Sequence, residues 1–378
     1  MIECDVCVVG AGIAGASVAA RLAADRAVVL VEREALPGWH TTSRSAAIFT
    51  HVLPGAQVAP LTRASEAFFR APPDGFSEAP LAQARPVLEF GDAGRFDALR
   101  EMLDSLRAGG GAARWVDGPE ACVMTPILRP EFAAGGVLDE DAFEMDVDAL
   151  LQGFLRRLRG LGGQLLTGAP LVGVERIGER WHVRAGETEV VASVLVNAAG
   201  AWGDEVAGLA GARGLGLEPR RRTMTVMELD RDDVGRWPMC VQADHGLYFK
   251  PDAGRLLVSA MDQTPSPPCD AYADDMDVAE ALDRFATVTT APLRRPLRTW
   301  AGLRTFAPDD EPVAGFDPDV PGFFWLVGQG GAGIQTAPAL SAAAAALVRA
   351  EPLPAALTDF GVSEALLSPA RFRTPQAD

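Results

Sequence analysis

One stretch of the chain decides the fold, CDVCVVGAGIAGASVAARLAADRAVVLVE at residues 4–32. Its first part, Cys4–Val9, is a short apolar run typical of a buried strand. Small and apolar residues then recur at helical spacing over Ala16–Ala24, and the β-branched run Ala27–Val31 leads to Glu32. The stretch therefore predicts a strand, a glycine turn, a helix and a second strand.

Three glycines in the turn have separate physical roles in a dinucleotide-binding site. Gly10 permits the tight exit from the strand, and Gly12 lets the backbone approach a pyrophosphate. Gly15 lets the helix pack closely on the strand, and the N-terminus of that helix presents free N–H groups to the phosphates. Glu32 lies 20 residues after Gly12, where an acid accepts hydrogen bonds from ribose hydroxyls. The motif predicts a dinucleotide cofactor and does not separate NAD from FAD.

The composition and charge exclude several classes of partner. The chain has 378 residues, enough for about two domains. With 34 Lys and Arg against 51 Asp and Glu, the net charge is -17, which argues against nucleic acid or an anionic membrane as a partner. No secretory leader pattern is visible, and no uncharged apolar run reaches the ~18 residues of a transmembrane helix. We therefore expect a soluble, cytoplasmic protein.

The five cysteines are scattered along the chain in an odd number, which is typical of a reducing compartment. Cys4 and Cys7 have the spacing of a redox pair, but residues three apart in a strand point to opposite faces. We interpret both as buried strand residues. No metal-ligand pattern is visible, so no metal site is predicted.

A hydroxyl-rich loop at residues 37–47 could wrap the pyrophosphate and the ring of a cofactor. The glycine motif, the terminal Glu32 and the sequence Ser43-Arg44-Ser45-Ala46-Ala47 together resemble the D-amino acid oxidase-type flavoenzymes. That family includes glycine oxidase, sarcosine oxidase and D-amino acid dehydrogenases. The similarity covers nearly the whole chain and is greatest to the D-arginine dehydrogenases. It implies FAD as the cofactor, held without a covalent tether.

The implied fold class is α/β, with a Rossmann-like FAD-binding domain interleaved with an α+β substrate domain built on a mixed sheet. Two later junctions, at 194–210 and 322–349, again run from a strand through small residues into a helix. The FAD-binding domain is expected to comprise residues 1–47, 148–214 and 307–378, and the substrate domain residues 48–147 and 215–306.

Two local patterns bear on how these domains are built. Leucines and a phenylalanine at helical spacing predict an amphipathic helix over Asp148–Leu161, capped by Asp146 or Asp148. A largely apolar run predicts a strand over Ala82–Phe90.

The resemblance assigns cofactor contacts to three parts of the chain. The residues at those positions are Gly10, Gly12, Ile13, Ala14, Gly15, Glu32, Arg33, Thr41, Thr42, Ser43, Arg44, Ser45, Ala46, Ala47, Ile48, Leu171, Ala199, Gly200, Trp202, Gly330, Gly331, Ala332, Gly333, Ile334 and Gln335. The last group begins a long helix, whose positive dipole end can stabilise negative charge on a reduced flavin.

The family oxidises an amine or alcohol carbon beside a carboxylate, and hydride leaves Cα for the flavin N5 atom. An α-carboxylate is best held by a bidentate arginine. Arg304 matches the family's carboxylate-binding arginine, Tyr248 a tyrosine that meets the same carboxylate, and Arg222 a second active-site arginine. Without the resemblance, both arginines would be interpreted as surface or salt-bridge residues. The substrate-binding candidates are Ile48, His51, Leu53, Val87, Met239, Gly331 and Gln335.

The resemblance thus predicts an enzyme that oxidises a D-amino acid with a free carboxylate to the imino acid, and then to a 2-oxo acid and ammonia. Oxygen, a quinone or another carrier would reoxidise the flavin. Two alternatives on the same scaffold stay open: a 2-hydroxy acid dehydrogenase with His51 as a base, and an oxidase of N-substituted amino acids such as sarcosine. A flavin-binding protein without turnover is a third alternative. His51 could equally be a packed or surface residue.

Four positions depart from the D-arginine dehydrogenases and predict a different side-chain preference. Those enzymes hold the substrate guanidinium with a glutamate and close a tyrosine over it. The residues at the departing positions are Ile48, Leu53, Val87 and Ala332. A cationic tail would lack a carboxylate partner there, whereas an apolar tail would bury area favourably. We expect neutral hydrophobic D-amino acids to be preferred over D-arginine and D-lysine, unless Glu89 or Glu78 replaces the missing acid.

Overall fold

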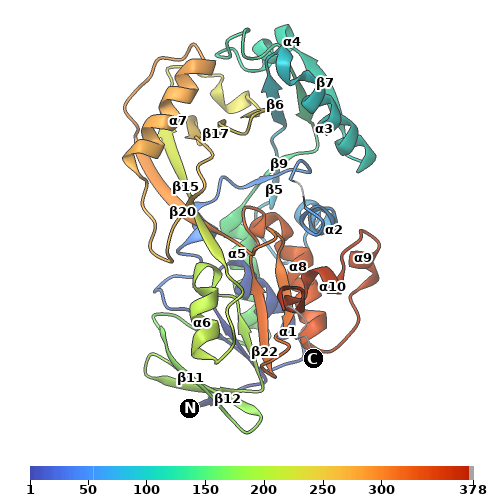
Figure 1. The fold of residues 1–378 in the computed structure, drawn as a ribbon, viewed down its shortest axis with the longest axis vertical. Coiled ribbons are helices and arrows are strands. Elements are labelled where there is room, and N and C mark those ends of the chain that lie inside the picture. The colour runs from blue at the N-terminus through green and yellow to red at the C-terminus, as the bar shows by residue number, and fades with distance from the viewer. Residues whose placement is uncertain (54, 374–378) are drawn as a thin grey trace.

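A six-stranded sheet gathers the N-terminal stretch with two distant parts of the chain (Figure 1). The structure, a computed structural model, describes residues 1–53 and 55–373. The strands, in their order across the sheet, are β10 (Gln164–Leu166), β3 (Val28–Val31), β2 (Val6–Val9), β14 (Val194–Asn197), β22 (Phe323–Val327) and β21 (Val313–Phe316). The first five are parallel, and β21 is antiparallel to β22. A parallel sheet of this kind needs apolar cover on both faces.

Both faces of the six-stranded sheet are covered. One face packs against the helices α1 (Ile13–Leu22), α5 (Val147–Gly160) and α8 (Gly333–Val348). The side chain of Asp146 caps α5 by accepting a hydrogen bond of 2.8 Å from the Ala149 N–H. The opposite face packs against α6 (Gly203–Leu209) and a second sheet of β1 (Ile2–Glu3), β13 (Thr188–Ala192), β12 (Arg180–Ala185) and β11 (Leu171–Ile177).

A nine-stranded sheet forms the other half of the molecule, at the top of Figure 1. Its main path runs through β19 (Thr264–Pro265), β15 (Glu218–Met227), β18 (Arg255–Ser259), β17 (Tyr248–Asp252), β16 (Met239–Gln242), β6 (Val87–Gly91), β8 (Gly135–Asp139) and β7 (Ala113–Asp117). The ninth strand, β20 (Arg298–Phe306), pairs with β15. The helices packed against this sheet are α3 (Phe96–Ala108), α4 (Gly118–Met124) and α7 (Asp275–Val288).

The two halves are joined by the long pair of β15 and β20, which runs down toward the six-stranded sheet in Figure 1. A small sheet of β4 (Ile48–Phe49), β9 (Phe143–Met145) and β5 (Ala82–Ala84) lies between them. The helix α2 (Val58–Arg70) packs on α8, so this part of the chain joins the core on the face of the six-stranded sheet that α1, α5 and α8 cover. Two short helices, α9 (Ala355–Thr358) and α10 (Glu364–Leu367), follow α8. The division of the chain into two interleaved domains remains our proposal.

The predicted α/β class is confirmed, and one predicted strand is wrong in its extent. The run Ala82–Phe90 forms two strands in different sheets, separated by Arg85 and Pro86. Proline has no N–H to donate to a ladder and restricts the residue before it, so the chain changes sheet at this point.

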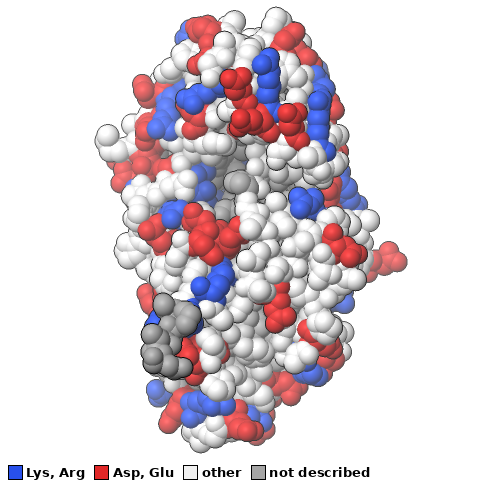
Figure 2. Space-filling model, turned by 45° about the vertical axis from the view of Figure 1, so that its right-hand side comes forward, with Lys and Arg blue, Asp and Glu red and all other residues white. Residues whose placement is uncertain are grey.

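The surface mixes both signs of charge, and Figure 2 shows acidic and basic side chains interspersed over one face. Across residues 1–53 and 55–373, no helix has both the length and the apolar character that crossing a bilayer requires.

Candidate active site

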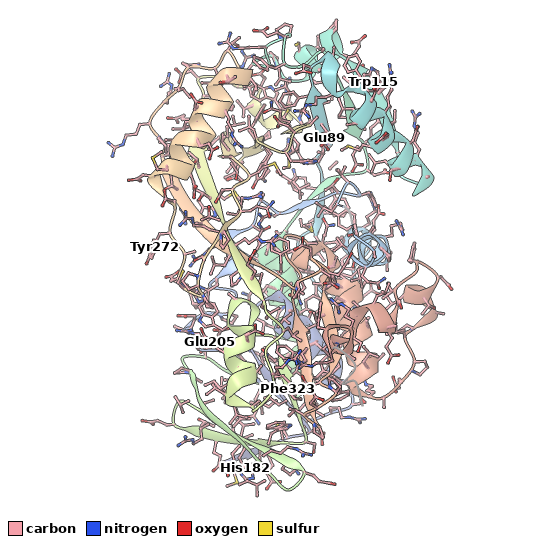
Figure 3. The ribbon with its side chains drawn as sticks, viewed as in Figure 1. Glu89, Trp115, His182, Glu205, Tyr272 and Phe323 are labelled. Carbon is pink, nitrogen blue, oxygen red and sulfur yellow. The ribbon has the colours of Figure 1, made fainter. Side chains whose placement is uncertain are left out.

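A central cavity of about 570 Å³ runs between the two large sheets. Its wall comes from the β2–α1 turn, the loop before β4, the nine-stranded sheet and the glycine loop before α8. Glu205 on α6 and Glu89 on β6 both line it, and Figure 3 shows them in the lower and upper halves of the molecule. A volume of this size is typical of a site for a cofactor or small molecule.

In the glycine turn, one glycine leaves the backbone open to a ligand, and two others let the helix pack tightly against the strand. Gly10 has a φ of +99°, and a Cβ on Gly15 would lie 1.8 Å from the Gly10 carbonyl oxygen. Gly12 lines the cavity, and a Cβ there would meet only the Thr42 hydroxyl, at 3.3 Å. The bare backbone at Gly12 is therefore the surface that a pyrophosphate could approach.

The carboxylate of Glu32 is fixed at the end of β3, where it lines the cavity. One oxygen accepts the Ala11 N–H at 2.7 Å, and the other accepts the Glu34 N–H at 2.9 Å. A carboxylate has about four lone-pair sites, so both oxygens can still accept bonds from ribose hydroxyls.

The loop after Gly38 ties the two halves of the molecule together. The Thr42 hydroxyl accepts the Ile13 N–H at 3.0 Å, and the Thr41 hydroxyl donates to the Leu303 carbonyl at 2.6 Å. Arg44 donates to the Ala301 carbonyl at 3.0 Å and forms an ion pair with Asp270, so its charge is already balanced within the protein. The predicted cofactor contacts in this loop line the cavity, except that Ser43 lies outside the lining and donates to the Gly38 carbonyl.

Aromatic and cationic side chains meet near α6. The Arg33 guanidinium carbon lies 4.9 Å from the centre of the Trp202 ring, and the His40 ring lies 4.6 Å from it on centroids. All three residues line the cavity, together with Leu171, Ala199 and Gly200. The sequence analysis assigned no role to His40.

The glycine loop before α8 brings a helix N-terminus to the cavity. Gly330, Gly331, Gly333 and Ile334 line it, and α8 begins at Gly333. Ala332 and Gln335 are buried outside the lining, and the Gln335 amide donates to the Thr62 hydroxyl at 2.7 Å. The positive end of the α8 dipole therefore faces the space where the resemblance expects a flavin.

Two guanidiniums from neighbouring strands converge on the cavity. Arg222 on β15 is buried and donates to the carbonyl oxygens of Asp262 at 2.9 Å and Met261 at 3.1 Å. Arg304 on β20 donates to the same Asp262 carbonyl at 3.3 Å, and its Nε has no hydrogen-bond partner among the described residues. A Cβ on Gly331 would lie 3.3 Å from the Arg304 Nη1, so the glycine makes room for this side chain.

The two arginines together are suited to bind an anion. Burial, with a further contribution from Arg222, lowers the pKa of Arg304 to about 9. A carboxylate bound between the two guanidiniums would offset their repulsion and satisfy donors that lack partners.

Tyr248 lies beside this pair on β17. Its ring centre is 5.8 Å from the Arg222 guanidinium carbon, and its hydroxyl donates to the Met224 sulfur at 3.0 Å. A thioether sulfur is a weak acceptor, so the hydroxyl can turn to a stronger one.

The remaining side chains of the cavity wall near Tyr248 are largely apolar. Among the residues predicted to bind substrate, Ile48, Leu53, Val87 and Met239 line the cavity. Val52, Met224, Val241 and Met261 also line it and were not identified from the sequence.

His51 does not contribute to this wall. Its Nε2 lies 3.1 Å from a carboxylate oxygen of Glu66, outside the cavity lining. The prediction that His51 touches substrate therefore finds no support in the geometry, because the ring turns toward α2.

Three further residues near the site were given no role, or only a secondary one, in the sequence analysis. Asp262 accepts the Thr223 N–H at 2.8 Å, so it holds the turn whose carbonyls position both arginines. Glu89 was considered only as a substitute acid, and His245 was not assigned a role, yet both line the cavity. No local sequence signal marks these three, since each is brought to the site by strand pairing.

Comparison with known proteins identifies the family. The chain matches the FAD dependent oxidoreductase (DAO) family over residues 5–347, and it belongs to that family. It is similar to the hydrogen cyanide synthase subunit HcnC of Pseudomonas aeruginosa, with 26% identity over 262 residues, which cover 65% of this chain and 58% of that protein.

Two solved structures share the fold. Glycine oxidase from Geobacillus kaustophilus has a TM-score of 0.83 and 20% identity, covering 96% of this chain and 99% of that chain. L-proline dehydrogenase from P. horikoshii has a TM-score of 0.84 and 18% identity, covering 98% of both chains.

FAD is the cofactor of this family, and the residues of the cavity fit it. The open backbone at Gly12, the fixed Glu32 carboxylate and the N-terminus of α8 offer partners for a pyrophosphate, a ribose and a flavin ring.

We expect the purified protein to be yellow and to release intact FAD when it is denatured. The described residues that line the cavity include no cysteine, and its two histidines, His40 and His245, each have a ring nitrogen near a carboxylate, at 3.0 Å from Glu34 and 3.6 Å from Glu89. Acid precipitation followed by absorbance of the supernatant and the pellet is the measurement. Flavin that stays with the precipitated chain would contradict the non-covalent assignment.

Proposed function

We propose that the chain oxidises a D-amino acid to the imino acid, which water then hydrolyses to a 2-oxo acid and ammonia. The observation that supports this is the cluster of Arg304, Arg222 and Tyr248 in the same cavity as the glycine turn. The cluster offers an α-carboxylate a bidentate anchor within the cavity that also fits the cofactor. The D configuration follows from the sequence resemblance.

Each residue of the cluster has a defined task in this proposal. Arg304 and Arg222 bind the carboxylate, and the carbonyls of Met261 and Asp262 fix Arg222 in place. Tyr248 turns its hydroxyl from Met224 to the carboxylate. FAD held in this cavity would supply the acceptor for the hydride from Cα, and oxygen or another carrier would take the electrons onward.

The protein also influences the protonation state of the substrate amine. The apolar wall disfavours an ammonium ion, so the amine binds in its neutral form and the lost proton goes to solvent. A neutral nitrogen lone pair can then assist the departure of hydride from Cα.

The 2-hydroxy acid alternative requires a base to take the hydroxyl proton. His51 was the candidate, and its ring contacts Glu66 outside the cavity lining. The one base considered for a 2-hydroxy acid thus lies outside the cavity, which supports an amino acid as the substrate.

At neutral pH we expect D-methionine, D-leucine and D-phenylalanine to bleach the flavin anaerobically, with higher kcat/KM than D-arginine or D-lysine. The reason is the apolar wall of Ile48, Leu53, Val87 and Met239, which buries an uncharged tail at about 25 cal/mol per Å². The measurement is the rate of flavin bleaching against each amino acid. 2-Hydroxy acids and sarcosine serve as comparison substrates. Bleaching by these compounds alone would overturn the proposal.

A further inference from the structure

Glu89 is a buried acid that the proposed chemistry does not use. Glu89 is only 2% exposed and lines the cavity from β6. Figure 3 labels it in the upper half of the molecule. Among the described residues its Oε1 has no hydrogen-bond partner. The closest cationic candidate is His245, whose Nε2 lies 3.6 Å from that oxygen on a side chain that is 57% exposed.

Strand pairing fixes the distance of Glu89 from the carboxylate anchor. Tyr248 pairs with Val241, and Val241 pairs with Glu89, so the three residues form one row across β17, β16 and β6. Directly paired residues share a face, and neighbouring strands lie about 4.8 Å apart, which places the Cα atoms of Glu89 and Tyr248 roughly 10 Å apart. An amino acid anchored at Tyr248 can therefore extend a side chain of several bonds toward Glu89.

The elements around Glu89 supply little else that is charged. β16 contributes Val241, and its one titratable side chain, the buried Cys240, packs in a different core cluster, while α3 turns Leu99, Leu103 and Leu106 inward. On β8 the acid Asp139 pairs with Val87 and already accepts the Thr50 hydroxyl at 2.9 Å. Asp244 follows β16 and precedes His245, and it accepts the Gly246 N–H.

A carboxyl in such a setting is costly unless something binds to it. An unpaired buried charge costs several kcal/mol, and even the neutral acid leaves polar atoms unsatisfied. Glu78, the other acid considered from the sequence, is exposed and lies outside the cavity lining. The missing partner of Glu89 is therefore expected to come from the ligand.

We propose that Glu89 is a specificity-determining residue whose charge decides whether the cavity accepts a neutral or a cationic substrate tail. The proposal rests on the proposed function, because the substrate carboxylate must first be anchored at Arg304 and Tyr248. With Glu89 protonated, the cavity takes D-amino acids with neutral tails. With Glu89 ionised, it also takes D-amino acids that carry an ammonium or a guanidinium group at the end of the tail.

The change between the two states falls in an accessible range of pH. Burial raises the pKa of Glu89 to about 8. The acid is mostly protonated at neutral pH, which agrees with the expected preference for neutral tails there. A cationic tail must first displace the proton, so its disadvantage shrinks as the pH rises toward 8 and then levels off.

The test compares D-arginine with D-citrulline, which has nearly the same shape and an uncharged end. Both share the α-amine and the α-carboxylate, so the titration of those groups nearly cancels in the ratio of their kcat/KM values. In the holoenzyme this ratio is expected to rise on the order of 100-fold between pH 6 and 9.5, following the ionised fraction of Glu89. Glu89→Gln should make the ratio independent of pH and lower it at high pH, whereas Glu78→Gln should leave the profile unchanged.

The outcomes separate the two proposals. If D-citrulline or D-methionine bleaches the flavin and the ratio is flat in the wild type, Glu89 does not set specificity while the proposed function stands. A ratio that rises with pH equally in Glu89→Gln also overturns the role of Glu89. If no D-amino acid bleaches the flavin, the proposed function fails, and the inference fails with it. The wild-type profile needs no variant, so poor folding of Glu89→Gln would not prevent a decision.

Discussion

Replacing Arg304 with alanine is expected to lower kcat/KM by roughly 30- to 5,000-fold while FAD stays bound, because a buried carboxylate that loses its charged partner costs about 2–5 kcal/mol. Arg222 alone would then hold the anion, and the Asp262 carbonyl would lose one of its donors. Steady-state kinetics with a reactive D-amino acid, together with the flavin absorbance of the purified variant, measures both parts of the prediction.

A second test variant, Tyr248→Phe, and two matched controls, Arg298→Ala and Tyr272→Phe, sharpen this test. Arg298→Ala removes an exposed arginine from the same strand and should leave kcat/KM unchanged. Tyr248→Phe removes one neutral hydrogen bond and should cost only about 0.5–1.5 kcal/mol. Tyr272→Phe, at a tyrosine that is 76% exposed, should cost nothing. Near-normal kcat/KM in Arg304→Ala would mean that the carboxylate binds elsewhere.

Replacing Gly15 with alanine is expected to destabilise the fold itself, by about 3 kcal/mol. The new Cβ would lie 1.8 Å from the Gly10 carbonyl oxygen, a backbone atom that cannot swing aside. The first turn of α1 or the end of β2 would have to move, and the cofactor site would move with it. Chemical denaturation of the protein stripped of FAD measures the loss.

Gly12→Ala is the matched control, because the same methyl group would meet one side-chain atom and no backbone atom within 4 Å. That atom is the Thr42 hydroxyl oxygen at 3.3 Å, a close contact that a small shift of the side chain relieves, so the protein without cofactor should lose much less stability than Gly15→Ala. The methyl would instead occupy the surface that a pyrophosphate approaches, and FAD affinity should fall on the order of tenfold or more. Equal loss of stability in the two variants would contradict the separate roles of these glycines.

The parts of the fold that depend on local pattern were predictable from the sequence. The βαβ stretch, the Asp146 cap and the junction after β22 each rest on residues close together in the chain. The break in Ala82–Phe90 could also have been predicted, since Pro86 disrupts a strand ladder unless it lies at an edge.

The parts of the site that depend on pairing were not predictable in this way. Glu89 reaches the cavity because β6 pairs with β16, and these strands are far apart in the sequence. The Asp262 carbonyl meets Arg304 only because β15 pairs with β20. Conversely, His51 lies in a segment that borders the cavity, but its ring points away from the cavity because its Nε2 contacts the Glu66 carboxylate. A family resemblance assigns positions and cannot assign side-chain directions.

The six-stranded sheet has a consequence for how the protein is made. β2 and β14 emerge from the ribosome well before β22 and α8, which complete the sheet and its cofactor cavity. At 5–20 residues per second, roughly 15–60 s separate the synthesis of β2 from that of β22. During this interval the nascent chain carries the complete glycine motif without the partner strand beside β14, so FAD cannot yet stabilise it. Apolar strands that wait so long for their neighbours are vulnerable to aggregation, and we expect chaperone binding to be concentrated on this incomplete sheet.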